Sequence, residues 1–209
     1  MITLFIDTST SFLNIAIFKN DILIEKKSIH SIEHSKYIMS EIEKIFKKNN
    51  ILPTDVKKIM VTIGPGSFTG IRIGVTIAKI YAWACKINII PISTLKAFAL
   101  SSNNKAYYLP LIDARRGYVY ASLFDENYNE ILKEQYIKID DLKEKILKFE
   151  NINYISDEEI TGVKTELINL NPENIFNYYK NKSGISPHRI IPNYLKKTEA
   201  EEKIGDIYD

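Results

Sequence analysis

The first hundred residues alternate between short apolar runs and polar turns. Apolar, β-prone runs at residues 2–6, 13–18 and 22–28 are separated by clusters of Asp, Asn and Ser, which predicts an antiparallel meander. Apolar residues between 35 and 48 then recur at helical spacing, which predicts an amphipathic helix. The order β-β-β-α-β-α-β is completed by a strand at 59–63, a helix at 69–87, a strand at 89–92 and a helix at 94–101.

The second half repeats the start of this pattern and then shortens. The expected elements are strands at 107–112, 118–124 and 131–139, a helix at 140–149, a strand at 154–156 and a helix at 172–180. Such an order implies mixed β-sheets flanked by helices, so we expect an α/β protein. The polar run Ser101-Ser102-Asn103-Asn104 predicts a boundary between an N-terminal lobe, 1–101, and a smaller C-terminal lobe, 102–209. The two lobes resemble the actin-like (ASKHA) fold, with the second lobe reduced.

The helix expected at 69–87 has two apolar faces. On a helical wheel, Arg72, Thr76, Lys79, Trp83 and Lys86 share one stripe about 80° wide. One apolar face carries Ile73, Ile77, Ile80 and Ala84, and the other carries the small residues Gly74, Ala78 and Ala82. A surface helix covers its own core with a stripe only somewhat over 100° wide, so the second face predicts a partner. The expected partner interface comprises Tyr37, Ile38, Met39, Ile73, Ile77, Ile80 and Tyr81.

A glycine-rich loop precedes this helix. Four of the chain's eight glycines lie within residues 64–74, which include the string Gly64-Pro65-Gly66-Ser67-Phe68-Thr69-Gly70. Such a loop is either a tight turn capped by Ser67 or Thr69, or a phosphate cradle at a helix N-terminus. It is not a Walker loop, because no Gly-Lys-Ser/Thr follows. We expect a structural loop formed by Gly64, Pro65, Gly66, Ser67 and Gly70.

Composition and charge narrow the function classes. The 209 residues are 45% hydrophobic and 26% charged, as in an ordinary globular protein, and the net charge of +2 is too balanced for nucleic-acid binding by this chain alone. Tyr107, Tyr108, Tyr118 and Tyr120 alternate along strands, which favours sheet packing over base stacking.

Cys85 is the single cysteine, so neither an intramolecular disulfide nor a multi-cysteine metal site is expected. With neither a signal peptide nor a long apolar run, we expect a cytoplasmic protein without a membrane segment.

Catalytic patterns are incomplete. His30 and His34 are four residues apart but lie at a strand end and a helix start, so we expect no metal site. Ser67 stands one position too early for a nucleophile elbow. Asp7-Thr8-Ser9-Thr10 and Asp113-Ala114-Arg115-Arg116-Gly117 stand where actin-like ATPases have phosphate loops, but the second contains two bulky arginines, and no two glycines are adjacent for an adenosine loop. We therefore expect no catalytic residue and no cofactor.

Motifs in order along nearly the whole chain resemble the bacterial TsaB family, also called YeaZ. The string Gly64–Gly70 with Arg72 is the most specific of them, and Lys196 stands where the family often has arginine. The other motifs are Asp7-Thr8-Ser9, Glu33-His34-Ser35, Ser93-Thr94-Leu95, Asp113–Tyr120 and Pro192-Asn193-Tyr194-Leu195.

The resemblance implies an actin-like, non-catalytic subunit that works in the formation of threonylcarbamoyladenosine in tRNA. Family members pair with the transferase subunit TsaD, and the ATPase TsaE joins them. The family's pairing surface uses two helices that match residues 35–48 and 69–87 here. The resemblance also implies a homodimer through the same surface when TsaD is absent.

Two other classes remain open from the residues. One is a small nucleotide-binding actin-like enzyme, a kinase or acyltransferase, that uses Asp7 and the Gly64–Gly70 loop. The other is a self-associating domain with no role in tRNA chemistry.

Overall fold

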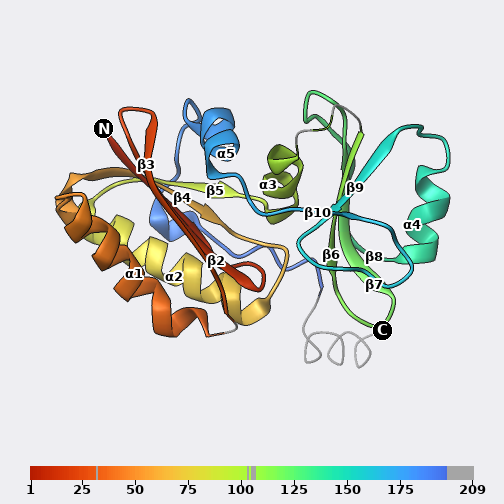
Figure 1. Cartoon of the computed structure of the whole chain (residues 1–209), viewed down its shortest axis with the longest axis horizontal. Helices are drawn as coiled ribbons and strands as arrows, with labels where there is room; N and C mark the ends of the chain where they lie inside the picture. Colours follow the sequence, from red (N-terminus) through yellow and green to blue (C-terminus); the bar gives the residue numbers. More distant parts are fainter. Residues whose placement is uncertain (32, 103, 105–106, 197–209) are drawn as a thin grey trace.

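The computed structural model describes residues 1–31, 33–102, 104 and 107–196, and it has two lobes, each built on a five-stranded sheet (Figure 1). The first sheet has the order β3-β2-β1-β4-β5. β1 (Ile2–Asp7) pairs antiparallel with β2 (Phe12–Lys19) and parallel with β4 (Val56–Thr62). β3 (Ile22–His30) and β5 (Ile89–Ile92) are the edge strands.

The second sheet repeats this topology with the order β10-β9-β6-β7-β8. β6 (Tyr107–Asp113), β7 (Tyr118–Phe124) and β8 (Glu130–Lys138) form the meander, and β9 (Ile152–Ser156) and β10 (Glu166–Leu167) add to it in parallel. The first lobe joins β4 to β5 through the long helix α2 (Phe68–Cys85), whereas residues 157–165 join β9 to β10 without a helix. The expected actin-like fold is therefore confirmed, and the second lobe is the reduced one.

Alternation along the strands gives the first sheet two apolar faces. Leu4 and Ile6 belong to a core shared with α1 (His34–Lys48) and α2. Phe5, between them, points to the opposite face and packs with residues of α3 (Thr94–Ser101) and α5 (Pro172–Tyr179). Figure 1 shows α1 and α2 on one side of this sheet and α5 on the other. Helices therefore cover both faces, which explains why β1 is buried along its whole length.

α3 lies between the two lobes, and all eight of its residues are buried (Figure 1). Ala97 and Leu100 belong to the core on the first sheet. Leu95 and Phe98 belong to a separate core with residues of the second sheet. On the far side of the second sheet, Leu142 and Ile146 of α4 (Ile139–Ile146) close a further core. One short helix thus contributes to the interiors of both lobes.

The C-terminal part of the described chain returns to the first lobe, which differs from the expected division at residues 101 and 102. Phe176 of α5 stacks on Phe18 of β2 with ring centroids 4.1 Å apart. Ile185 forms a bridge with Ile89 at the edge of the sheet, and Ile190 is buried in the core with α1 and α2. This return depends on contacts distant in sequence, which local polarity does not indicate. The expected extended segment after Pro192 is described only as far as Lys196; the rest lies outside the described residues.

Candidate partner-binding surface

α2 places its small-residue face against its own lobe. Gly74, Ala78 and Ala82 are buried, and a Cβ on Gly74 would collide with the hydroxyl of Thr8. The isoleucine face therefore points outward: Ile73 and Ile77 are partly buried at the edge of the core, and 61% of Ile80 is exposed. Of the two apolar faces expected from the sequence, the isoleucine face is the one available to a partner.

The Gly64–Gly70 loop is filled by the turn after β1. The backbone N–H of Ser67 donates to the carbonyl of Ser9 at 2.7 Å, and the Thr8 hydroxyl donates to the carbonyl of Gly70 at 2.7 Å. A Cβ on Gly66 or on Gly70 would overlap the backbone of this turn. Ser67 also caps α2, because its hydroxyl accepts a hydrogen bond from the N–H of Gly70 at 3.2 Å.

The two remaining members of the expected structural loop, Gly64 and Pro65, also have clear positions. Gly64 has φ +108° and faces the carbonyl of Asn193, so a side chain there would be strained and would collide. The carbonyl of Gly64 accepts from the N–H of Thr94, the first residue of α3. Pro65 is buried beside them. The geometry matches a close-packed turn, two of whose glycines lie against the backbone of residues 8 and 9.

Asp7 is completely buried and its carboxylate is fully used inside the protein. Oδ1 accepts from the N–H and hydroxyl of Ser9 at 3.1 and 2.5 Å, and from the Thr62 hydroxyl at 2.6 Å. Oδ2 accepts from the side-chain amide of Asn14 at 2.9 Å. Hydrogen bonds from four donors compensate the cost of burying the charge. Asp7 thus ties together β1, β2 and β4, and in this conformation it has no surface exposed to a nucleotide.

The α1 residues expected in the interface behave differently from one another. Met39 is 55% exposed, and Tyr37 is partly buried. Ile38 is wrongly included in the expected interface, because it is completely buried in the core of the first lobe and has no surface to offer a partner.

Tyr81, on α2, is half-buried and serves its own lobe. Its hydroxyl donates to the carbonyl of Pro53 at 2.7 Å, and its ring packs edge-on against Phe46 of α1. Burial raises the pKa of this hydroxyl well above its usual range, with smaller contributions from Cys85 and Asp55.

A shallow groove of about 450 Å³ adjoins the isoleucine face. It is lined by Ser35, Phe68, Thr69, Arg72, Ile73, Thr76 and Ile77. At its edge, the guanidinium of Arg72 lies 3.7 Å from the centre of the Phe68 ring, and its Nε donates to the Tyr194 hydroxyl at 2.9 Å. An arginine that stacks on one aromatic ring and hydrogen-bonds a tyrosine hydroxyl is typical of residues that contribute strongly to binding energy in interfaces. The sequence placed Arg72 on the polar stripe but did not indicate this aromatic setting, because Tyr194 is more than a hundred residues away.

Two carboxylates of the second lobe contact the first. Glu134 accepts hydrogen bonds from the Ser93 hydroxyl and, at 2.7 Å, from the Asn193 amide, while burial raises its pKa. Asp157 lies near the side chain of Thr10 in the first lobe. Burial raises the pKa of Asp157 to about 6, assisted by the negative charges of Glu158 and Asp7. Both carboxylates therefore contribute to the contact between the lobes.

The two histidines and the two adjacent arginines that the sequence singled out occupy separate positions. Nε2 of His34 lies 2.8 Å from the carbonyl oxygen of Thr10, whereas the His30 ring packs against Phe12. Arg115 and Arg116 are exposed in the turn after β6. Within the described parts of the chain, no three His, Cys, Asp or Glu side chains could share a metal ion. None of the described helices is long and apolar enough to cross a membrane.

The chain is similar to proteins that carry the names TsaD and TsaB. The family described as "TsaD: tRNA N6-adenosine threonylcarbamoyltransferase" matches residues 24–177. The "tRNA threonylcarbamoyladenosine biosynthesis protein TsaB" of Bacillus subtilis is 31% identical, and the match covers 97% of each chain. The protein of the same name from Buchnera aphidicola of Acyrthosiphon pisum is 28% identical over 97% of this chain and 92% of its own length.

A solved structure shares the fold. "YeaZ from Pseudomonas aeruginosa" superposes with a TM-score of 0.76 at 17% identity, and the match covers 93% of this chain and 99% of that one. The superposition shows that both lobes and their arrangement are common to the two proteins. Together with the sequence identity over nearly its whole length, this means that the chain belongs to the TsaB (YeaZ) family.

Proposed function

We propose that this chain is a non-catalytic subunit for the formation of threonylcarbamoyladenosine in tRNA, and that it pairs with a TsaD transferase. The pairing surface is the outward face of α2 with the exposed part of α1. Its members are Tyr37, Met39, Ile73, Ile77 and Ile80, flanked by Phe68 and Arg72. TsaE joins the pair in the cytoplasm, and a homodimer forms through the same surface when TsaD is absent.

The observation that carries the proposal is the exposure of apolar side chains along two adjacent helices. Ile80 and Met39 are more than half exposed, and Ile73 and Ile77 fill only the margin of the core. Apolar patches of this kind mark interaction sites in soluble proteins. The small-residue face of the same helix packs against its own lobe, which leaves the isoleucine face directed outward.

The non-catalytic part of the proposal rests on Asp7 and the glycine-rich loop. In an actin-like enzyme these would face a nucleotide, but here the carboxylate is buried under four donors and the loop is packed against Thr8 and Ser9. The chemistry is therefore assigned to the partner.

A charge at Ile80 tests the pairing surface. Ile80→Glu leaves the fold intact, because the side chain is largely exposed, but it buries an unpaired carboxylate when a partner covers the helix. We expect pairing with TsaD to weaken by at least about 2 kcal/mol, roughly thirtyfold in Kd. The measurement is size-exclusion chromatography followed by calorimetric titration of TsaD.

Leu147→Glu is the matched control, because Leu147 is 81% exposed on the second lobe. This variant should pair as the unmodified chain does. Equal affinity of Ile80→Glu and Leu147→Glu for TsaD, with both folds retained by circular dichroism, would overturn the proposed surface. Loss of the homodimer by Ile80→Glu alone would support the shared use of that surface.

A further inference from the structure

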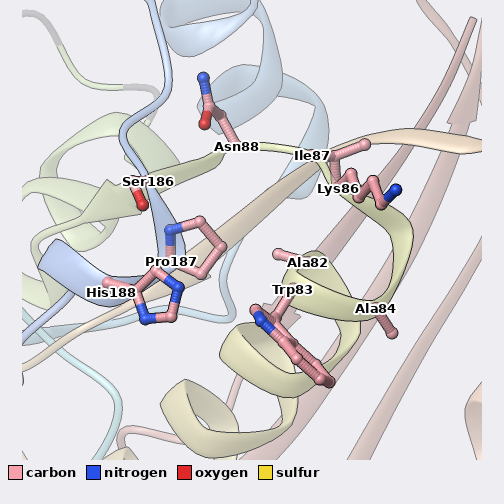
Figure 2. Close-up of a pocket in the computed structure, with 9 residues that line it drawn as sticks. All are labelled: Ala82, Trp83, Ala84, Lys86, Ile87, Asn88, Ser186, Pro187 and His188. Carbon is pink, nitrogen blue, oxygen red and sulfur yellow. The ribbon is translucent and has the colours of Figure 1, made fainter.

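A second pocket lies at the C-terminal end of α2, away from the groove beside α1. It has a volume of about 430 Å³ and is formed where α2 meets the segment that ends in η2 (Pro187–Arg189). Figure 2 shows the indole of Trp83 projecting from α2, with Pro187 and His188 on the facing segment. The other lining residues are Ala82, Ala84, Lys86, Ile87, Asn88 and Ser186.

Hydrogen bonds and one close backbone approach connect the walls of this pocket. The ammonium group of Lys79 donates to the carbonyl of Ile190 at 2.9 Å, which ties η2 to α2. Ile89 and Ile185 exchange two backbone hydrogen bonds of 2.9 and 2.8 Å. Gly184 allows the two segments to approach, because a Cβ there would lie 2.9 Å from Cβ of Asn88. These contacts fix the position of the 184–190 segment against α2 and the start of β5.

The lining contains one large aromatic ring, Trp83, and one lysine, Lys86, among small and apolar residues. Trp83 is 66% exposed, which is unusual for the largest apolar side chain and leaves its ring available for stacking. Lys86 lies on the rim and Arg189 follows His188; both are exposed, and neither forms an ion pair with a carboxylate in the described residues. The nine lining residues include Asn88, Ser186 and His188 as hydrogen-bonding groups and no acidic residue.

We propose that this pocket binds an unpaired nucleotide of an RNA strand, with the base on Trp83 and the backbone phosphates near Lys86 and Arg189. An exposed aromatic ring that shares a pocket with one cation, with a second cation next in sequence to the pocket's His188, suits single-stranded nucleic acid, since every base has a π-face and every linkage a negative charge. The choice of RNA rests on the proposed role in tRNA modification.

The pocket adds to the RNA affinity of a complex with TsaD, and by itself it is not a tight RNA-binding site. Two cations and one ring give weak binding on their own, in line with the balanced net charge of the chain. Within a complex with TsaD, the same contacts act on an RNA that is already held. Trp83 thus extends the RNA-contacting surface of the assembly onto this subunit.

Tryptophan fluorescence gives a selective test, because Trp83 is the only tryptophan of the chain. The full chain is titrated at low salt with an RNA hairpin that carries an unpaired loop, with a fully paired duplex of the same length, and with AMP. We expect the hairpin to quench the emission in a saturable, salt-sensitive way, and the duplex to have little effect. Equal quenching by AMP, at equal nucleotide concentration, would overturn the assignment to an RNA strand in favour of a free mononucleotide.

Affinity in the complex gives the second test. Labelled tRNA is titrated with the complex of TsaD and this chain, and Trp83→Ala should weaken binding roughly tenfold, the usual effect of removing one stacking ring. Lys86→Gln should lower the slope of log K against log salt by about 0.7, as for one lost single-strand phosphate contact. Lys133→Gln, an exposed lysine on β8, is the control and should change neither.

Pairing with TsaD is checked on every variant by size-exclusion chromatography, which separates this inference from the proposed function. Trp83→Ala with normal pairing and unchanged tRNA affinity would overturn the RNA pocket and leave the pairing surface untouched. Trp83→Ala that fails to pair would also overturn it, because the ring would then belong to the protein interface.

Discussion

At the scale of single residues, Asp7 shows how a position that resembles a catalytic one can be structural. Its carboxylate accepts hydrogen bonds from residues on β2 and β4 and from the turn that fills the glycine-rich loop. The sequence could indicate an acidic residue after the first strand, as in a phosphate loop. It could not indicate the burial, which depends on Asn14 and Thr62 arriving from neighbouring strands.

Asp7→Ala should destabilise the protein. Removing the carboxylate leaves buried donors of Ser9, Asn14 and Thr62 without an acceptor, at a cost of about 3 kcal/mol or more in the free energy of unfolding. Urea unfolding followed by circular dichroism measures this cost. Glu159→Ala, an exposed carboxylate in the second lobe, is the control and should change stability by less than about 0.5 kcal/mol. A fully stable Asp7→Ala chain would show that the network contributes little.

At the scale of elements, local pattern predicted the helices and strands well. α1, α2, α3 and α5 begin and end within two residues of their expected limits, because their apolar spacing and caps are local signals. β10 was not predicted, since two residues carry no periodicity. The helical wheel predicted two apolar faces for α2. Which of the two packs against the first lobe depends on the position of Thr8, which the sequence does not indicate.

Gly70→Ala tests the close approach of α2 to the turn after β1. The added methyl group would overlap the carbonyl of Thr8, so either the helix or the turn must move. We expect a loss of about 1–3 kcal/mol in stability, the usual range for overpacking. Thr76→Ala, at an exposed position of the same helix, should be nearly neutral or slightly stabilising. Thermal unfolding of both variants provides the comparison, and equal melting temperatures would contradict the close contact.

At the scale of the whole molecule, the contact between the lobes contains a carboxyl group with a shifted proton affinity. Burial and neighbouring charges raise the pKa of Asp157 from 3.8 to about 6. The folded state therefore binds more protons than the unfolded state between these values. The resulting penalty on stability is present above pH 6 and decreases as the pH falls toward 4.

Asp157→Asn should remove this pH dependence. The amide carries no charge, and its oxygen remains a hydrogen-bond acceptor. The variant is expected to be more stable than the unmodified chain at pH 7.5, with a smaller difference at pH 5. Urea titrations at both values measure the two differences, and a difference that does not change with pH would show that Asp157 ionises normally in the folded protein.

The order of helices and strands predicted two lobes. It did not predict which segments of the chain belong to each lobe. The order β-β-β-α-β is legible in both halves, so repetition of the sheet topology could be anticipated. The sharing of α3 between two cores and the return of α5 to the first sheet depend on tertiary contacts. Tertiary packing also decides which of the expected interface residues have exposed surface: periodicity predicted an apolar isoleucine face, while Ile38 is buried in its own lobe and the Tyr81 hydroxyl donates to the carbonyl of Pro53.

The return of residues 172–196 to the first lobe has a consequence for synthesis on the ribosome. Phe18 lacks its stacking partner Phe176, and the core around α2 lacks Ile190, until the chain has been translated past the second lobe. The core of the amino-terminal lobe is therefore completed only after the second lobe has been synthesised. Nascent chains that stall before α5 would expose an uncovered sheet surface and become substrates for chaperones or proteases.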